Sequence, residues 1–144
     1  MIVVLDASAA VKLVLDENRS DQVRRLWDER LTMTAPSVVA AEVAAAIRAA
    51  SRDGRITEPA ARLAQQSWAS LIEDIDMLAF DQTLADRARG LAATRTVRGM
   101  DAIYLAVAVR LAEVNSTGLL SFDVRQRGAL TPEDGVHLLP AEAA

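Results

Sequence analysis

The sequence predicts an α/β fold of three layers, in which a short parallel central sheet is flanked by helices on both faces. Ile2–Leu5 is a β-branched run without polar alternation, which is typical of a strand buried on both faces. Similar short apolar runs alternate with helical segments along the chain, as they do in parallel α/β proteins. The 144 residues, 51% of them hydrophobic, suit one domain with a substantial core. We expect that domain to span residues 1–139, followed by a frayed tail at 140–144.

The first quarter of the chain is expected to form two strands and two helices. Asp6 follows the strand 2–5, and residues 7–15 are rich in helix-forming alanine and leucine. Ser20 can cap a second helix. A strand at 31–35 then ends at a proline.

Two further helices should pack as a hairpin. The spacing predicts a helix from the N-cap Ser37 to about residue 53, with Gly54 ending it in the left-handed conformation and Glu42 in its second turn. Thr57 can cap the next helix, and Leu63 belongs to the apolar side expected to face the core.

The second half repeats the alternation of strands and helices. Asp81 is placed to cap a helix that ends near residue 93. The other expected elements are a weak strand at 75–80, an apolar helix at 100–112, strands at 117–122 and 136–139, and a turn or short helix at 124–128.

Four carboxylates lie in apolar surroundings, where an isolated ionised carboxylate is costly to desolvate. They are Asp6, Glu42, Asp101 and Asp123. Asp6 and Asp123 follow predicted strands, whereas Glu42 and Asp101 lie near the starts of predicted helices. In open α/β sheets the carboxyl ends of the strands and the starts of the following helices share one edge, where ligands bind. We therefore expect the four acids to converge there and a divalent cation to neutralise them.

Composition narrows the kind of site. The chain has no cysteine and a single histidine, so a metal would be held by oxygen, the ligand that Mg²⁺ and Mn²⁺ prefer. A net charge of -4 argues against binding nucleic acid simply by being basic. No apolar stretch approaches the roughly 18 to 20 residues of a membrane span, so we expect a cytoplasmic protein without a membrane partner.

Four ordered motifs resemble those of PIN-domain nucleases, and in length and helix content the chain is most similar to the VapC toxins of bacterial toxin–antitoxin pairs. The motifs are Asp6-Ala7-Ser8, Pro36-Ser37 with Glu42, Gly99-Met100-Asp101-Ala102 and Leu120-Ser121-Phe122-Asp123. The resemblance implies an Mg²⁺- or Mn²⁺-dependent endoribonuclease with Asp6, Glu42, Asp101 and Asp123 as metal-binding catalytic residues. It also implies supporting roles for Ser8 and Ser121, homodimerisation, and inhibition by a cognate antitoxin.

Each acid alone has a structural explanation. Asp6 could be an N-cap, Asp101 a first-turn acid and Asp123 a turn residue. Tyr104 could belong to the core or line the active-site groove that the resemblance implies. Alternative functions are a catalytically silent PIN-like scaffold, a metal-dependent adhesion module, which would need a second serine where Ala10 stands, and a phosphotransferase, whose Asp-x-Asp pattern is absent.

Overall fold

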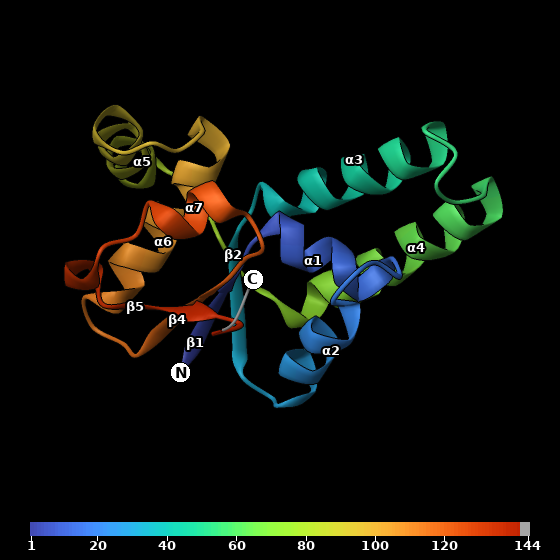
Figure 1. Cartoon of the computed structure of the whole chain (residues 1–144), viewed down its shortest axis with the longest axis horizontal. Helices are drawn as coiled ribbons and strands as arrows, with labels where there is room; N and C mark the ends of the chain where they lie inside the picture. The colour runs from blue at the N-terminus through green and yellow to red at the C-terminus, as the bar shows by residue number, and fades with distance from the viewer. Residues whose placement is uncertain (142–144) are drawn as a thin grey trace.

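The computed structural model describes residues 1–141, and at its centre is a five-stranded parallel sheet with the order β3-β2-β1-β4-β5 (Figure 1). The strands are β1 (Ile2–Leu5), β2 (Thr32–Pro36), β3 (Asp76–Leu78), β4 (Thr117–Leu120) and β5 (Val136–Leu139). Val3, Val4 and Leu5 of the central strand are fully buried. Burial on both faces explains why β1 shows no polar alternation.

Seven α-helices surround this sheet among the described residues. They are α1 (Ala7–Val14), α2 (Ser20–Asp28), α3 (Val39–Arg52), α4 (Glu58–Leu71), α5 (Gln82–Thr94), α6 (Gly99–Ala112) and α7 (Val124–Gly128), with 3-10 turns at Ile72–Asp74 and Pro132–Asp134. In Figure 1, α1 to α4 lie on one side of the sheet and α5 and α6 on the other. The predicted three-layer fold with a short parallel sheet is confirmed.

Helix α6 is the most deeply buried helix of the described chain. Every residue from 102 to 108 is buried, and the helix contacts α5 and four of the strands. Such a helix is apolar on all sides, which is why its sequence shows no amphipathic pattern. Its first turn, which carries Asp101, lies outside this buried stretch.

The hairpin of α3 and α4 projects away from the sheet, as Figure 1 shows. The indole N–H of Trp68 donates to the carbonyl of Ala40 at 3.1 Å, two residues before Glu42. Gly54 follows α3 with a φ of 74°, the left-handed conformation expected of it. The hydrogen bond between Trp68 and Ala40 joins α4 to the first turn of α3, which also carries Glu42.

Several local expectations were wrong. Ser20 is the first residue of α2 and not its cap, and α3 begins after Val38, so Glu42 lies in the first turn and not the second. Leu63, assigned to the side of its helix that faces the core, is 65% exposed, and Phe80, the last residue of the predicted strand 75–80, is 45% exposed. The strands expected at 75–80 and 117–122 are shorter than predicted, because hydrogen-bonded pairing ends before the apolar runs do.

The end of the chain is described only in part. Arg127 donates to the carbonyls of Leu139 and Pro140, each at 2.9 Å. Residues 142–144 of the expected tail lie outside the described residues, and the domain limits stay a prediction. Within residues 1–141, none of the helices has the length and apolar character needed to cross a membrane.

Candidate metal centre

Asp6 lies at the carboxyl end of β1, and its carboxylate is held by an extensive set of hydrogen bonds. Its side chain is buried and caps α1 by accepting the N–H of Ser8 at 3.1 Å. The hydroxyls of Ser8 and Ser121 donate to the same oxygen, Oδ2. Oδ1 accepts from the amide of Gln126 at 3.3 Å. Burial raises the pKa of Asp6, and these hydrogen bonds oppose the rise.

The register of the sheet explains how Ser121 reaches Asp6. Leu5 and Leu120 are paired in β1 and β4, and the N–H of Asp6 donates to the carbonyl of Leu120 at 3.0 Å. The residues that follow the two strands therefore lie side by side. Ser8 thus supports Asp6, as the resemblance implied. Ser121, which was expected to support Asp123 or the metal site, bonds Asp6 as well as the backbone of Asp123.

Asp123 and Asp101 stand at the starts of two helices. Asp123 caps α7 by accepting the N–H of Gln126 at 2.8 Å, and its own N–H donates to the Ser121 hydroxyl at 3.1 Å. Asp101 is in the first turn of α6, where the helix dipole favours a negative charge. Burial, followed by repulsion from Asp6 and Asp123, nevertheless raises the pKa of Asp101, and the nearby Arg98 opposes this effect.

Glu42 approaches the centre from the first turn of α3. Its Oε1 is buried and has no hydrogen-bond partner. Burial, followed by repulsion from Asp6 and Asp101, raises the pKa of Glu42 to about 7. The buried Tyr104 hydroxyl lies close to Glu42 and offsets part of the rise in the pKa of Glu42. Burial, followed by the negative charges of Glu42 and Asp6, raises the pKa of Tyr104.

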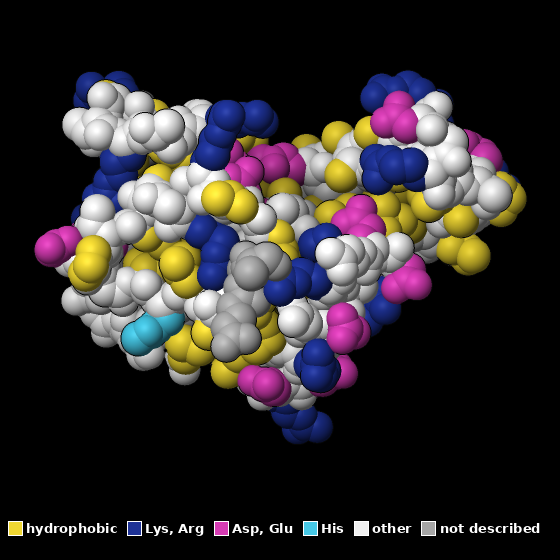
Figure 2. Space-filling model, viewed as in Figure 1, with side chains coloured by type: hydrophobic (Ala, Val, Ile, Leu, Met, Phe, Trp, Pro, Cys, Tyr) yellow, Lys and Arg dark blue, Asp and Glu magenta, His cyan; other side chains and the backbone are white. Residues whose placement is uncertain are grey.

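The four acids belong to one electrostatic cluster. Asp6 and Asp101 repel each other, Glu42 is repelled by both, and Asp123 repels Asp101. In Figure 2, acidic side chains gather at the surface between α7 and the start of α3, with Lys or Arg side chains beside them. The structure therefore brings all four sequence-predicted residues to one edge of the sheet.

The cluster is not a closed metal cage. Within residues 1–141, no group of three or more His, Cys, Asp or Glu side chains is arranged, as the side chains stand, to hold a metal ion. The carboxylates of Asp6 and Asp123 also serve as helix caps. Mg²⁺ retains several waters and is usually held by only one or two carboxylates directly, so an open oxygen-only set fits such an ion. The unpartnered Oε1 of Glu42 is available as a further ligand.

Sequence reasoning missed Gln126. Its side chain is fully buried and its amide contacts Asp6, yet nothing in the segment Val124-Arg125-Gln126-Arg127 distinguishes it from a surface helix. A buried amide beside a carboxylate becomes visible only once the fold is known.

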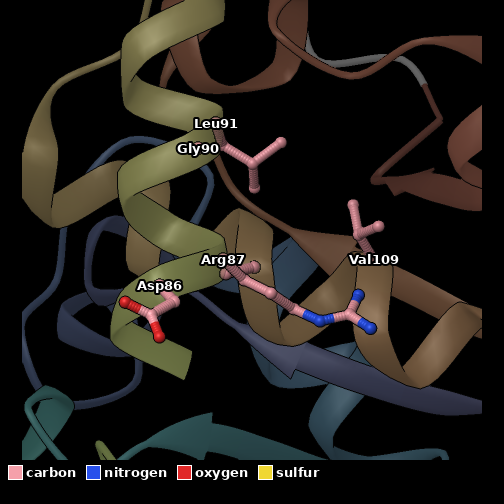
Figure 3. Close-up of a pocket in the computed structure, with 6 residues that line it drawn as sticks. Asp86, Arg87, Gly90, Leu91 and Val109 are labelled. Carbon is pink, nitrogen blue, oxygen red and sulfur yellow. The ribbon is translucent and has the colours of Figure 1, made fainter. Parts of the chain in front are cut away.

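None of the four clustered carboxylates lines the cavity between α5 and α6. That cavity, of about 270 Å³, lies beside Asp86, Arg87, Gly90, Leu91, Ala106 and Val109 (Figure 3). Figure 3 shows Arg87 extending from α5 towards Val109 of α6, and its guanidinium also forms an ion pair with Glu113. The cavity shares no residue with the acidic cluster.

Comparison with known proteins identifies the family to which this fold belongs. A family model described as PIN domain matches residues 3–129. The chain belongs to the PIN-domain family. It is 31% identical over 112 residues to Ribonuclease VapC45 of Mycobacterium tuberculosis (strain CDC 1551 / Oshkosh), with 78% of each chain covered. It is also 35% identical over 125 residues to Ribonuclease VapC46 of Mycobacterium tuberculosis (strain ATCC 25618 / H37Rv), with 87% of each covered. The chain is thus a VapC-type PIN domain.

Solved structures support the same fold for this PIN-domain chain. Mycobacterium tuberculosis VapC20, described as a Sarcin-Ricin loop cleaving toxin, matches with a TM-score of 0.65 at 19% identity. The match covers 88% of this chain and 94% of the VapC20 chain. FitAcB from Neisseria gonorrhoeae matches with a TM-score of 0.69 at 13% identity, covering 96% and 97%. The family assignment decides against the adhesion-module and phosphotransferase alternatives.

Proposed function

We propose that this PIN-domain chain is a metal-dependent endoribonuclease and the toxin of a toxin–antitoxin pair. The observation that carries the proposal is the gathering of Asp6, Glu42, Asp101 and Asp123 at the carboxyl edge of a parallel sheet, with repulsion linking them. A protein does not gain stability by bringing like charges together, so the arrangement is better explained by a ligand that neutralises them. The curated relatives, named as ribonucleases, supply the class of substrate.

The four acids have different roles in this proposal. Asp6 and Asp101 are the principal metal ligands because they lie at the centre of the repulsive cluster. Glu42 contributes its unpartnered oxygen from the first turn of α3. Asp123, whose Oδ1 is occupied by the cap of α7, acts from the edge of the site.

The ion that suits these residues is Mg²⁺ or Mn²⁺, because every donor is an oxygen. The chemistry that such an ion supplies when bound is activation of water and neutralisation of charge on the phosphate. The chain itself holds the carboxylates in place through Ser8, Ser121 and Gln126. The carboxyl group of Glu42, with its pKa raised to about 7, can also exchange a proton when the site is free of metal.

An antitoxin and a second copy of the chain are the proposed partners. Support for the antitoxin comes from solved structures of the same fold, which include a toxin–antitoxin complex from Klebsiella pneumoniae, with a TM-score of 0.64 at 16% identity. VapBC2 from Rickettsia felis, bound to a DNA fragment from its promoter, is similar with a TM-score of 0.63. The second copy is proposed from the family resemblance alone. A toxin acting on cellular RNA would work in the cytoplasm.

Cleavage of RNA by purified variants tests this function. Wild-type protein should cleave structured RNAs with Mg²⁺ or Mn²⁺ and not with EDTA, whereas Asp6→Asn and Asp101→Asn should lose activity by at least about 100-fold. Asparagine caps helices about as well as aspartate, so Asp6→Asn removes the charge and keeps the cap of α1.

Asp81→Asn is the matched control. Asp81 caps α5 by accepting the N–H of Leu84 at 2.9 Å, and it lies beside Arg110 and Leu111, at the other end of α6 from Asp101. This variant should retain wild-type cleavage. Equal cleavage by folded Asp6→Asn and Asp81→Asn would refute the site, and no cleavage by wild type with either metal would favour the silent scaffold.

A further inference from the structure

Gln126 places an uncharged amide inside the acidic cluster. Its side chain is fully buried, which is costly for a primary amide unless its donors are bonded. Nε2 donates to Oδ1 of Asp6 and to the backbone carbonyl of Asp101, each at 3.3 Å. Its Oε1 is buried without a partner. The side-chain hydrogen bonds of Gln126 among the described residues therefore both run through its amide nitrogen.

These contacts connect three elements that carry acids. Asp6 follows β1, Asp101 lies in the first turn of α6, and Gln126 itself is in α7, where its backbone N–H bonds the carboxylate of Asp123. One residue thus contacts three of the four acids. Its side chain spans from the end of the central strand to the start of α6.

The amide also donates a hydrogen bond to the second carboxylate oxygen of Asp6. Oδ2 accepts from the backbone and hydroxyl of Ser8 and from the Ser121 hydroxyl, whereas Gln126 is the donor to Oδ1 among the described residues. The three bonds to Oδ2 limit rotation of the carboxylate about its Cβ–Cγ bond, and the bond from Gln126 to Oδ1 restricts that rotation further from the other side. Gln126 therefore helps to fix which way Oδ1 faces.

An amide suits this position better than a charged group. A lysine or arginine would neutralise Asp6 and compete with a divalent cation, and a glutamate would add a further like charge. An amide donates hydrogen bonds and leaves the negative charge of the cluster unchanged.

We propose that Gln126 is a positioning residue of the metal centre, which orients the Asp6 carboxylate and fixes it relative to the start of α6. The inference rests on the proposed function, since it concerns how the same site is prepared for a divalent ion. Residues that orient metal ligands in this way typically change metal affinity by 10- to 100-fold when replaced.

The test is Mn²⁺ binding and RNA cleavage by the full chain carrying Gln126→Met. Methionine keeps the length and volume of the side chain and removes the amide. Calorimetric titration of the metal-free variant should show Mn²⁺ binding weakened by about 10-fold or more. Cleavage at saturating Mn²⁺ should show a lower kcat with little change in KM, because the RNA-binding surface is unchanged.

Gln82→Met is the matched control. Gln82 makes the same kind of bond, from its amide to the Asp86 carboxylate at 3.1 Å, on the exposed side of α5. This variant should match wild type within about twofold in Mn²⁺ affinity and in kcat. If Gln126→Met does not fold, Gln126→Asn keeps the amide but shortens its reach, and should weaken Mn²⁺ binding in a folded protein.

The outcomes are distinguishable. If wild type binds Mn²⁺ and cleaves RNA while the folded Gln126 variants behave like Gln82→Met, Gln126 is a structural tether and this inference is overturned. If wild type itself neither binds Mn²⁺ nor cleaves RNA, the proposed function fails and the inference with it. Weakened binding and lower kcat confined to the Gln126 variants would support the positioning role.

Discussion

Replacing Glu42 with glutamine should stabilise the metal-free protein at pH 8 and leave its stability nearly unchanged at pH 4. The pKa of Glu42 is about 7 in the folded chain, against an ordinary value of 4.5. A group whose pKa is raised by folding contributes its full stability below the ordinary pKa and loses it as the pH rises through the folded pKa. The free energy of unfolding of the wild type should therefore fall between pH 4.5 and 7. The glutamine variant should lack the contribution of Glu42 to this fall.

The structure sets the size of this effect. The difference of 2.5 between 7 and 4.5, at about 1.36 kcal/mol per pKa unit, gives a ceiling of roughly 3 kcal/mol. Glu42 is only partly buried, and water screens part of the repulsion, so we expect about 1 to 2 kcal/mol. The variant should exceed wild type by this amount at pH 8.

Urea denaturation in EDTA at several pH values between 4 and 8 measures the difference in the free energy of unfolding. Subtracting the two proteins at each pH cancels the other titrating groups. Glu73→Gln, at an exposed position in the 3-10 turn after α4, is the control and should show no comparable trend. A flat difference for Glu42→Gln, or a variant less stable than wild type at pH 8, would refute the electrostatic argument.

Three further predictions concern other contacts. Asp101→Asn should leave the metal-free protein at pH 7.5 as stable as wild type or slightly more stable, since it relieves repulsion, and thermal denaturation should show a smaller stabilisation by Mn²⁺. Trp68→Phe should cost about 1 kcal/mol in urea denaturation because it leaves the Ala40 carbonyl without the indole donor. Arg95→Ala should destabilise the chain by about 1 to 2 kcal/mol at pH 7. Because Arg95 holds the pKa of Asp134 below its usual range, this loss should shrink as acid titration protonates Asp134 below pH 4.

The sequence was sufficient to place the four acids because strand and helix patterns determine which chain ends share an edge. The apolar run before Asp6 predicted a strand, and the alanine-rich segment around Glu42 predicted a helix. Because the strands are parallel, the strand ends and the starts of the following helices lie at the same edge of the sheet. The structure also shows that the simpler explanations and the functional one coexist. Asp6 and Asp123 are helix N-caps and members of the cluster at the same time.

Other features depend on tertiary contacts that linear spacing does not encode. Leu63 has the spacing of an inner residue, but the buried face of α4 is formed by Ala61, Ala64 and Trp68, which leaves Leu63 exposed. Gln126 resembles a surface residue in sequence because its two acceptors come from segments 25 and 120 residues away. Such long-range polar contacts are the part of the site that only the fold reveals.

Anomalous diffraction from crystals grown with Mn²⁺ tests the central claim most directly. The account predicts one or two anomalous peaks at the carboxyl edge of the sheet, about 2 Å from carboxylate oxygens of Asp6 or Asp101 and absent from Asp101→Asn crystals. A peak elsewhere on the molecule, or none in crystals soaked at millimolar Mn²⁺, would contradict the assignment of these carboxylates as a metal centre.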